Sequence, residues 1–211
     1  MWIRATLEIS TMDSLHKLAE YFAEFPGIGP RQARRFVYFL LTRNLSYLED
    51  MARLILDIKK NVRICASCFR FYPDGKSTLC PICANVNRNK EELMIVARDV
   101  DFESIEKSHV YHGLYFILGG TIPILEKEPE KKVRLKELKE RLRIQTPKEI
   151  ILSLNITADG ENTAEYIRQF ITTHFDDKNM KVSVLGRGLS TGSELEYVDT
   201  ETIKSALENR G

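Results

Sequence analysis

Four cysteines gather within a short stretch of the chain, and their spacing makes them the residues best suited to chemistry. They form two Cys-x2-Cys pairs, Cys65 with Cys68 and Cys80 with Cys83, separated by eleven residues. Each pair can turn two thiolates toward one point, and two pairs supply the four tetrahedral sulfur ligands that structural Zn²⁺ prefers. The spacing therefore predicts one zinc ion held by all four cysteines.

The expected role of this ion is structural. Protein ligands fill all four positions, so no position stays open for water or substrate. The segment is too short and polar to fold by burial alone, and metal binding can supply on the order of 10 kcal/mol in such modules. Two other interpretations, a redox pair or unrelated core cysteines, fit less well, because a thioredoxin-type site needs one Cys-x-x-Cys pair and not two.

A double-glycine turn near the N-terminus is a candidate contact with nucleic acid. Gly27 and Gly29 lie in Phe-Pro-Gly-Ile-Gly-Pro, between two helical patterns, as in a helix-hairpin-helix motif. Glycines permit a close approach of the backbone, and the free N–H groups that begin the second helix can face a phosphate. Three arginines that could pair with the neighbouring phosphate follow on its first turns: Arg31, Arg34 and Arg35.

Such contacts read the DNA backbone and not its sequence. The alternative is an ordinary Gly-Pro helix break with arginines on a solvated face, and the turn alone favours that alternative. The charge distribution and the neighbouring cysteines reverse the preference. Residues 1–90 hold 14 Lys/Arg and 8 Asp/Glu, whereas residues 91–211 hold 17 and 22, and a basic half favours a polyanionic partner.

The elements that must position these residues change in character along the chain. Helical spacing of apolar residues predicts three helices before the cysteines, the third with Ser46 as N-cap and Glu49 completing a capping box. After the cysteines, short apolar runs alternate with helical stretches, which indicates βαβ units on a mostly parallel sheet. The expected strands are 93–97, 114–118, 149–154 and 181–185, and the expected later helices are 102–107, 133–143, 163–175 and 202–208.

The sequence thus predicts an α/β protein in four parts. These are a helix-hairpin-helix domain (1–60), a zinc module (61–88), an α/β domain with a mostly parallel sheet (89–185) and a short C-terminal helical segment (186–211). No apolar run approaches the roughly 20 residues that span a bilayer, so a cytoplasmic protein is expected. Most Phe and Tyr residues fall on apolar stripes and need no base-stacking role, with Phe69, Phe71 and Tyr72 as the exceptions.

Taken in order, these parts resemble the RecR family of recombination mediator proteins. Local matches cover nearly the whole chain: the glycine turn, the cysteine set, and residues 111–120, 159–164 and 192–199. The resemblance implies that the α/β domain is Toprim-like. It also implies a non-enzymatic, nucleoid-associated DNA-binding factor in recombinational repair, which acts with RecO and RecF to load recombinase on single-stranded DNA. Family members look like dimers or ring-shaped tetramers that can encircle duplex DNA.

Topoisomerases and primases also contain Toprim domains, so an enzyme must be considered. Their chemistry needs a glutamate after the first strand and an Asp-x-Asp pair after a later one, because these carboxylates hold Mg²⁺. Here the first position falls on Ala97 and the pair on Asn155 and Thr157. These residues bind a hard cation poorly, which puts a magnesium role in doubt.

Other carboxylates remain near these positions. Asp159 and Glu161, with Asp101, Glu103 and Glu106, could form a weak acidic patch that faces a basic partner such as RecO, and solvated surface charge explains them equally well. Two competing hypotheses stay open. One is a Toprim-type, Mg²⁺-dependent nuclease or topoisomerase that uses Asp159 and Glu161. The other is a zinc scaffold that binds only proteins and shows no salt-dependent affinity for DNA.

Overall fold

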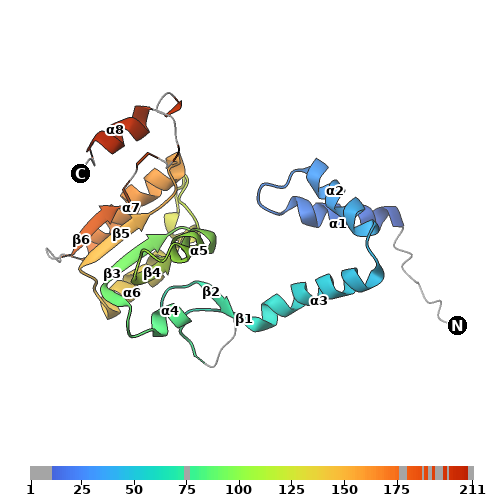
Figure 1. The fold of residues 1–211 in the computed structure, drawn as a ribbon, viewed down its shortest axis with the longest axis horizontal. Helices are drawn as coiled ribbons and strands as arrows, with labels where there is room; N and C mark the ends of the chain where they lie inside the picture. The colour runs from blue at the N-terminus through green and yellow to red at the C-terminus, as the bar shows by residue number, and fades with distance from the viewer. Residues whose placement is uncertain are drawn as a thin grey trace. The chain divides into compact units, whose positions relative to one another are not determined.

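The computed structural model describes residues 11–73, 77–175, 180–186, 188–189, 192, 197–198 and 200–208 (Figure 1). Contacts divide the chain into two units, with the division after Asn61. The boundaries expected at residues 88 and 185 stay predictions. Among the described residues, no helix is both long and apolar enough to cross a bilayer.

The first unit consists of three helices, α1 (Thr11–Ala23), α2 (Pro30–Leu41) and α3 (Leu45–Asn61). Helices α1 and α2 pack together through the Phe22 ring, which meets the ring of Phe36 edge to face at 5.7 Å. Ala33 and Val37 are the buried residues of α2. The helix–turn–helix arrangement expected around the two glycines is therefore present.

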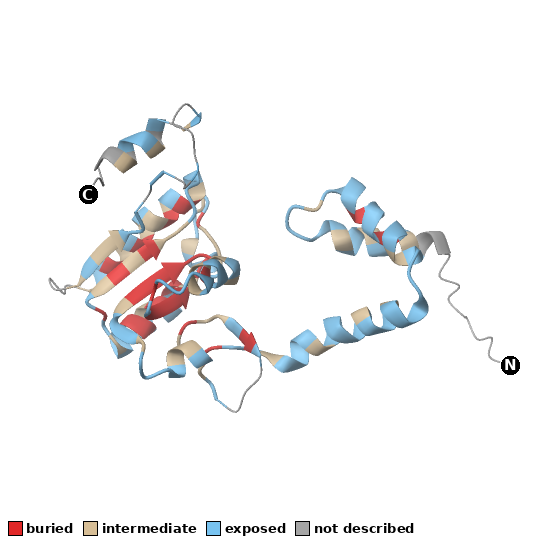
Figure 2. Cartoon of the chain, viewed as in Figure 1, coloured by how far each residue is buried: buried red, intermediate tan, exposed pale blue. Residues whose placement is uncertain are grey.

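Helix α3 begins differently from the expectation. Its first N–H groups are capped by Asn44, whose Oδ1 accepts from the Tyr47 N–H at 2.9 Å. The prediction of Ser46 as N-cap is wrong, because Asn44 is an equally good capping residue and Ser46 lies inside the first turn. None of the residues of α3 is buried (Figure 2).

The second unit is built on a four-stranded sheet in the order β4-β3-β5-β6. The strands are β3 (Asn89–Val96), β4 (Gly113–Ile117), β5 (Glu149–Ser153) and β6 (Lys181–Val184). All three pairings are parallel, which confirms the mostly parallel sheet. The helices are α5 (Asp99–Lys107), α6 (Leu135–Ile144), α7 (Ala158–His174) and α8 (Thr200–Glu208), with a short 3-10 turn, η1 (Pro129–Lys131), before α6.

Helix α7 starts five residues before its expected start. Thr157 caps it by accepting the Gly160 N–H at 3.1 Å. Glycine usually counts against a helix, but a Cβ at Gly160 would come within 2.0 Å of the Asn155 carbonyl oxygen. The backbone after β5 passes so close to Gly160 that no larger residue fits. Glycine is therefore required here, although it lowers the intrinsic helix propensity of this turn.

Alternate residues of β3 and β4 face two different helical layers, so β4 and the second half of β3 are buried on both sides (Figure 2). Ile95, Phe116 and Leu152 belong to the larger core, which α6 and α7 complete. Val96 and Tyr115 belong to a smaller core with Phe102 of α5. Burial on both faces explains why these strands are nearly continuous apolar runs.

Candidate metal centre and nucleic-acid interface

Two tight turns carry the four cysteines. The first connects β1 (Val62–Ile64) to β2 (Phe71–Pro73), an antiparallel pair that the sequence pattern did not predict. The second precedes and enters α4 (Pro81–Ala84). The Cys80 N–H donates to the Cys65 Sγ at 3.3 Å, a bond that favours the thiolate form of the acceptor.

The sulfur positions fit a single tetrahedral ion. All four Sγ atoms lie within 4.8 Å of one another, and the Cys68 and Cys80 Sγ atoms are 3.6 Å apart. A zinc ion about 2.3 Å from each sulfur requires sulfurs about 3.8 Å apart. Cys65, Cys68 and Cys80 are buried and Cys83 is half-buried. The spacing-based prediction of one four-cysteine metal centre is thus confirmed as a geometric cluster.

Hydrogen bonds among the four cysteines shift their pKa values in opposite directions, downward for Cys65 and Cys80 and upward for Cys68 and Cys83. Hydrogen bonds from Cys68 and Cys80 lower the pKa of Cys65, whereas the hydrogen bond with Cys65 raises the pKa of Cys68. Arg141 of α6 is only 7% exposed. Burial lowers the pKa of its guanidinium, and the charges of Cys83, Cys68 and Cys65 oppose that shift. This cation therefore offsets part of the negative charge that four thiolates create.

The cysteine module is fastened to the sheet at β4, through its backbone and one aromatic side chain. The Ile117 N–H donates to the Cys68 carbonyl oxygen at 2.8 Å. Phe69 follows Cys68 and extends its ring into the larger core, with its centroid 5.4 Å from that of Phe116. Phe69 therefore serves packing and is not available for the base-stacking role that the sequence left open.

A second contact joins the module to α5. The Phe71 N–H donates to the Asp99 carboxylate at 2.8 Å, and the Arg70 guanidinium lies 4.2 Å from the Phe102 ring centroid. Tyr72 is buried beside the cysteines and donates to the Ser77 carbonyl oxygen at 2.6 Å. Of the three aromatic residues proposed for base stacking, only Phe71 remains exposed.

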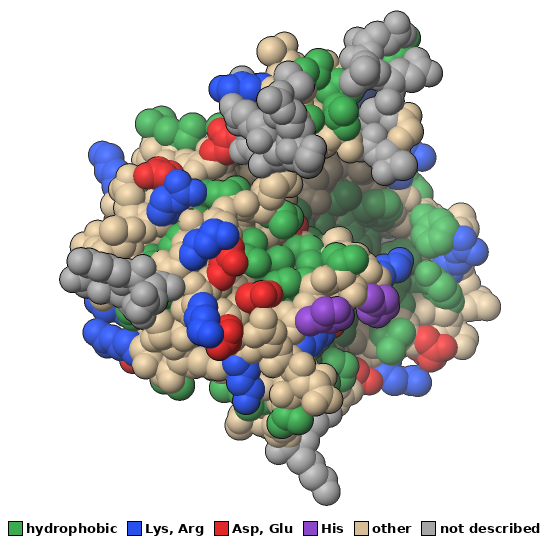
Figure 3. Space-filling view, turned by 60° about the vertical axis from the view of Figure 1, so that its left-hand side comes forward, with side chains coloured by type: hydrophobic (Ala, Val, Ile, Leu, Met, Phe, Trp, Pro, Cys, Tyr) green, Lys and Arg blue, Asp and Glu red, His purple; other side chains and the backbone are tan. Residues whose placement is uncertain are grey.

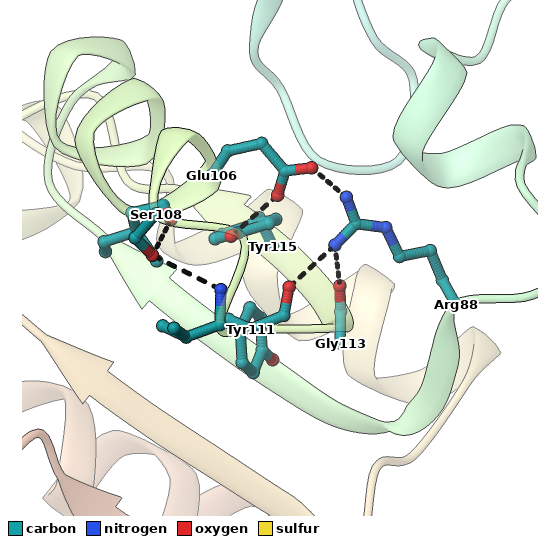
Figure 4. Close-up of polar contacts among 8 residues, drawn as sticks. Arg88, Glu106, Ser108, Tyr111, Gly113 and Tyr115 are labelled. Atoms are coloured by element: carbon teal, nitrogen blue, oxygen red, sulfur yellow. Dashed lines mark hydrogen bonds and ion pairs between the residues drawn. The ribbon is translucent and has the colours of Figure 1, made fainter.

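Arg88 connects the end of the module to the sheet and α5 (Figure 4). Its guanidinium forms an ion pair with Glu106 and donates to the carbonyl oxygens of Tyr111 at 3.1 Å and Gly113 at 3.4 Å. Glu106 also accepts from the Tyr115 hydroxyl at 2.9 Å. Burial, and then this hydrogen bond, raise the pKa of Tyr115. The Glu106 carboxylate, which the sequence pattern assigned to an acidic surface patch, is therefore bound within this network.

The glycine turn presents an open start to α2. Gly27 has a φ of 77°, a conformation that favours glycine. Gly29 is the N-cap residue and offers no side chain to the first N–H groups of the helix. A Cβ at either glycine would meet nothing within 4 Å. Arg31, Arg34 and Arg35 are all exposed, and α2 has no acidic residue in its first turn.

Charge on the second unit is arranged differently from charge on α2. Exposed ion pairs join Lys148 to Glu91 at 2.6 Å and Lys181 to Glu149 at 3.0 Å. Across the face that comes forward in Figure 3, basic and acidic side chains likewise lie beside one another. Neutralisation within such pairs leaves no large field of one sign on this face.

The positions of the enzymatic Toprim carboxylates are filled by groups with structural roles. Ala97 directly follows β3, is buried, and its carbonyl oxygen accepts from the Gly119 N–H at 2.9 Å. The Asn155 carbonyl oxygen accepts from the Thr157 N–H at 2.9 Å, and the Thr157 side chain caps α7. Since β3 and β5 are neighbours, these positions do share one end of the sheet, but they supply no carboxylate.

The proposed acidic patch is only partly present. Asp101 closes a capping box with Arg98, whose N–H it accepts at 2.9 Å, and Glu106 is paired with Arg88. Both carboxylates therefore have a structural partner within the chain, and their contact with another protein stays a prediction. Asp159 and Glu161 lie in the first turn of α7, where negative charge also stabilises the helix.

Comparison with known proteins identifies the family. The Toprim domain model matches residues 91–186, and the model described as RecR, C-terminal, matches residues 188–210. Recombination protein RecR of Chloroflexus aggregans is 36% identical over 194 residues, 92% of this chain and 91% of that protein. Recombination protein RecR of Herpetosiphon aurantiacus is 34% identical over 200 residues, 95% of each chain.

This chain belongs to the RecR family. Recombination protein RecR of Prochlorococcus marinus (strain MIT 9312) agrees, with 35% identity over 196 residues, 93% of this chain and 94% of that protein. The resemblance inferred from the glycine turn, cysteines and later motifs is thereby confirmed, as is the Toprim-like domain. Membership places this RecR-family chain in DNA recombination and repair. Residues 193–196 and 199 of the last motif lie outside the described residues.

Proposed function

We propose that this RecR-family chain is a non-enzymatic, DNA-binding recombination mediator that acts with RecO and RecF to load recombinase on single-stranded DNA. The observation that carries the DNA-binding part is the start of α2. There Gly27, Gly29, Arg31, Arg34 and Arg35 form an open, acid-free turn. The family relationship supports the recombination part.

The backbone at this turn suits a phosphate. The Ala33 N–H is the first of α2 to be bonded within the helix, to the Gly29 carbonyl oxygen at 3.0 Å. The Arg31 and Gln32 N–H groups before it belong to the first turn, where a helix leaves its donors unsatisfied. Gly29 has an ordinary φ of −85° and no close neighbour. Internal packing therefore does not explain its glycine, whereas close approach of a partner does.

Replacing Arg31 and Arg35 by alanine tests this assignment. Each arginine that leaves a phosphate reduces the number of counterions released, so both affinity and its salt dependence should fall. We expect duplex and gapped DNA to bind about tenfold or more weakly, with a shallower slope of log affinity against log salt. Fluorescence anisotropy at several salt concentrations measures both quantities.

A matched variant controls for the lost charge. Lys131→Ala with Lys136→Ala removes two exposed cations from the second unit and should leave affinity within about twofold. Circular dichroism should show both double variants folded. If the Arg31/Arg35 variant binds DNA as tightly as the unchanged protein, the turn is not the DNA contact.

We assign the cysteine cluster to one structural Zn²⁺ per chain. Four sulfur donors at tetrahedral spacing favour zinc over the oxygen-preferring cations. The ion would be held by Cys65, Cys68, Cys80 and Cys83, and when bound it would tie the two turns together. With four protein ligands, it would not activate water.

The absence of catalysis is part of the proposal. Ala97, Asn155 and Thr157 occupy the positions where Toprim enzymes carry carboxylates, and Thr157 is already engaged as a helix cap. Purified protein should not nick DNA in Mg²⁺. Nicking that disappears in Glu161→Gln would instead support a Toprim nuclease.

We further propose self-association into a dimer or tetrameric ring. Helix α3 exposes four large apolar side chains within five residues, at Leu54, Ile55, Leu56 and Ile58, each more than half exposed. Such a group on a single helix is typical of a surface that another chain covers. Asp159 and Glu161 remain the candidates for contact with a basic partner such as RecO, and the protein is expected in the cytoplasm at the nucleoid.

A further inference from the structure

One face of α2 combines flat rings with cations. Gln32, Arg35, Phe36 and Phe39 recur at the spacing of a single helix face, and they line a hollow of about 540 Å³. Arg43 extends this face, because its guanidinium lies over the Phe39 ring, 4.0 Å from the centroid. These five residues are called the Phe39 face below.

The aromatic side chains here are not used by the core. Phe39 and Tyr38 are 44% and 63% exposed, and Tyr47, 5.8 Å from the Arg43 guanidinium, is 46% exposed. The sequence pattern assigned most Phe and Tyr residues to apolar stripes with no base-stacking role, whereas the rings of these three residues are exposed. Within the part of the chain that the structure describes, the Phe36 ring contacts the Phe22 ring of α1.

Charge around the Phe39 face indicates the chemistry of its occupant. Residues 25–48 contain four arginines and neither Asp nor Glu. A second copy docked face to face would bring another set of arginines against the first, which is unfavourable. A polyanion with flat apolar groups matches both the cations and the rings.

We propose that the Phe39 face binds single-stranded nucleic acid by stacking an unpaired base on the Phe39 ring or on the Arg43 guanidinium plane. Arg35 lines the same hollow as this ring, and Arg43 lies over it, so both cations are placed to pair with the flanking phosphates. In a duplex the bases are stacked on one another and are not available. The inference rests on the proposed function, since it adds a base-stacking contact to the helix proposed to bind the DNA backbone.

Phe39→Ala in the full-length protein tests the stacking contact. Affinity for a dT oligonucleotide should fall about tenfold, the size expected for one lost stacking contact. Affinity for duplex DNA of the same phosphate count should stay within about twofold, and the salt slope should not change, because no phosphate contact is lost. Tyr21→Ala, an exposed aromatic on α1, is the control and should bind both ligands normally.

A second measurement does not depend on the alanine variant folding well. Phe39→Trp in a Trp2→Phe background places the only tryptophan on this face. Its fluorescence should be quenched by the dT oligonucleotide and much less by duplex, whereas Tyr21→Trp should respond to neither.

Three results for Phe39→Ala would overturn the proposal. Its affinity could fall equally for the dT oligonucleotide and the duplex, or for neither. Its solution mass could also fall without a change in DNA affinity. The last result would assign the face to a second copy of the chain. If the unchanged protein binds no DNA, the proposed function fails too. If Arg31→Ala/Arg35→Ala weakens both forms while Phe39→Ala alters neither, only the stacking proposal fails.

Discussion

Phe69 illustrates how much a single residue connects in this protein. Its φ of 63° lies in the left-handed region, which is unfavourable for a bulky side chain. Its N–H donates to the Cys65 carbonyl oxygen at 3.0 Å, which closes the first cysteine turn. Because the ring is also inserted in the larger core, burial offsets the strain, and one residue couples the metal centre to the sheet.

At position 69, a glycine variant should be more stable than an alanine variant, the reverse of the order usually found. Both remove the ring, so both should lower the free energy of unfolding by about 1–3 kcal/mol, since the side chain is half-buried. Phe69→Gly relieves the positive φ, and we expect it to be about 1 kcal/mol more stable than Phe69→Ala. Urea unfolding compares the two. An alanine variant at least as stable as the glycine variant would mean that the turn is not strained.

The residues that the sequence predicted correctly act through local spacing, whereas those that it missed act through long-range contacts. Ligand chemistry is local, so spacing alone predicted Cys65 and its three partners. Phe69, Arg88 and Arg141 act through contacts with residues far along the chain, so no local pattern predicted these roles, and Phe69 was singled out only as a candidate for base stacking. Arg88 reads as surface charge in the sequence, yet the fold pairs it with Glu106.

At the scale of elements, the short strands and turns of the cysteine module have little support of their own. The β1–β2 pair has three residues in each strand, and α4 has four residues. An isolated hairpin of this size is not stable in water. Their stability must come from the metal and from the contacts with β4 and α5.

Removal of the metal should therefore loosen β4 as well as the module. Elemental analysis is expected to find about one zinc per chain. After chelation, hydrogen exchange at the Ile117 amide should accelerate strongly, because its acceptor is the Cys68 carbonyl oxygen. Ile167 and Ile171, in the core on α7, should change far less, and added zinc should reverse the effect. Unchanged exchange at Ile117 in metal-free protein would refute this coupling.

The sequence predicted element types well and element starts less well. Apolar runs located all four strands of the parallel sheet, and the signal is most continuous in β3 and β4, where burial on both faces requires apolar residues in succession. Helices α3 and α7 begin earlier than predicted. Asn44 and not Ser46 caps α3, and Gly160, which usually indicates the absence of a helix, lies in the first turn of α7. The β1–β2 pair was missed because its order comes from the cysteine module and not from an apolar pattern.

For the whole molecule, the exposed apolar residues of α3 lead us to expect that copies of the chain associate through this helix. Ile55→Glu with Ile58→Glu should shift the solution mass from a dimer or tetramer toward 24.4 kDa, because charges buried in an apolar contact are costly. Val86→Glu with Ile144→Glu replaces two exposed apolar residues in the other unit and should leave the mass unchanged.

Light scattering at two salt concentrations, with and without gapped DNA, measures this assembly together with its ligand. An apolar contact should persist in high salt, whereas DNA binding should weaken. A monomer for the unchanged protein under every condition would exclude the ring.

The bond from Ile117 to Cys68 has a consequence beyond holding the module in place. On its open side, β4 also has Arg134 donating to the Ile117 carbonyl oxygen at 2.8 Å and Arg88 donating to that of Gly113. These contacts keep the outermost strand from pairing with a strand of another molecule. Loss of the proposed metal should release the Cys68 contact, and we expect the freed part of β4 to pair with strands of other molecules and to cause aggregation.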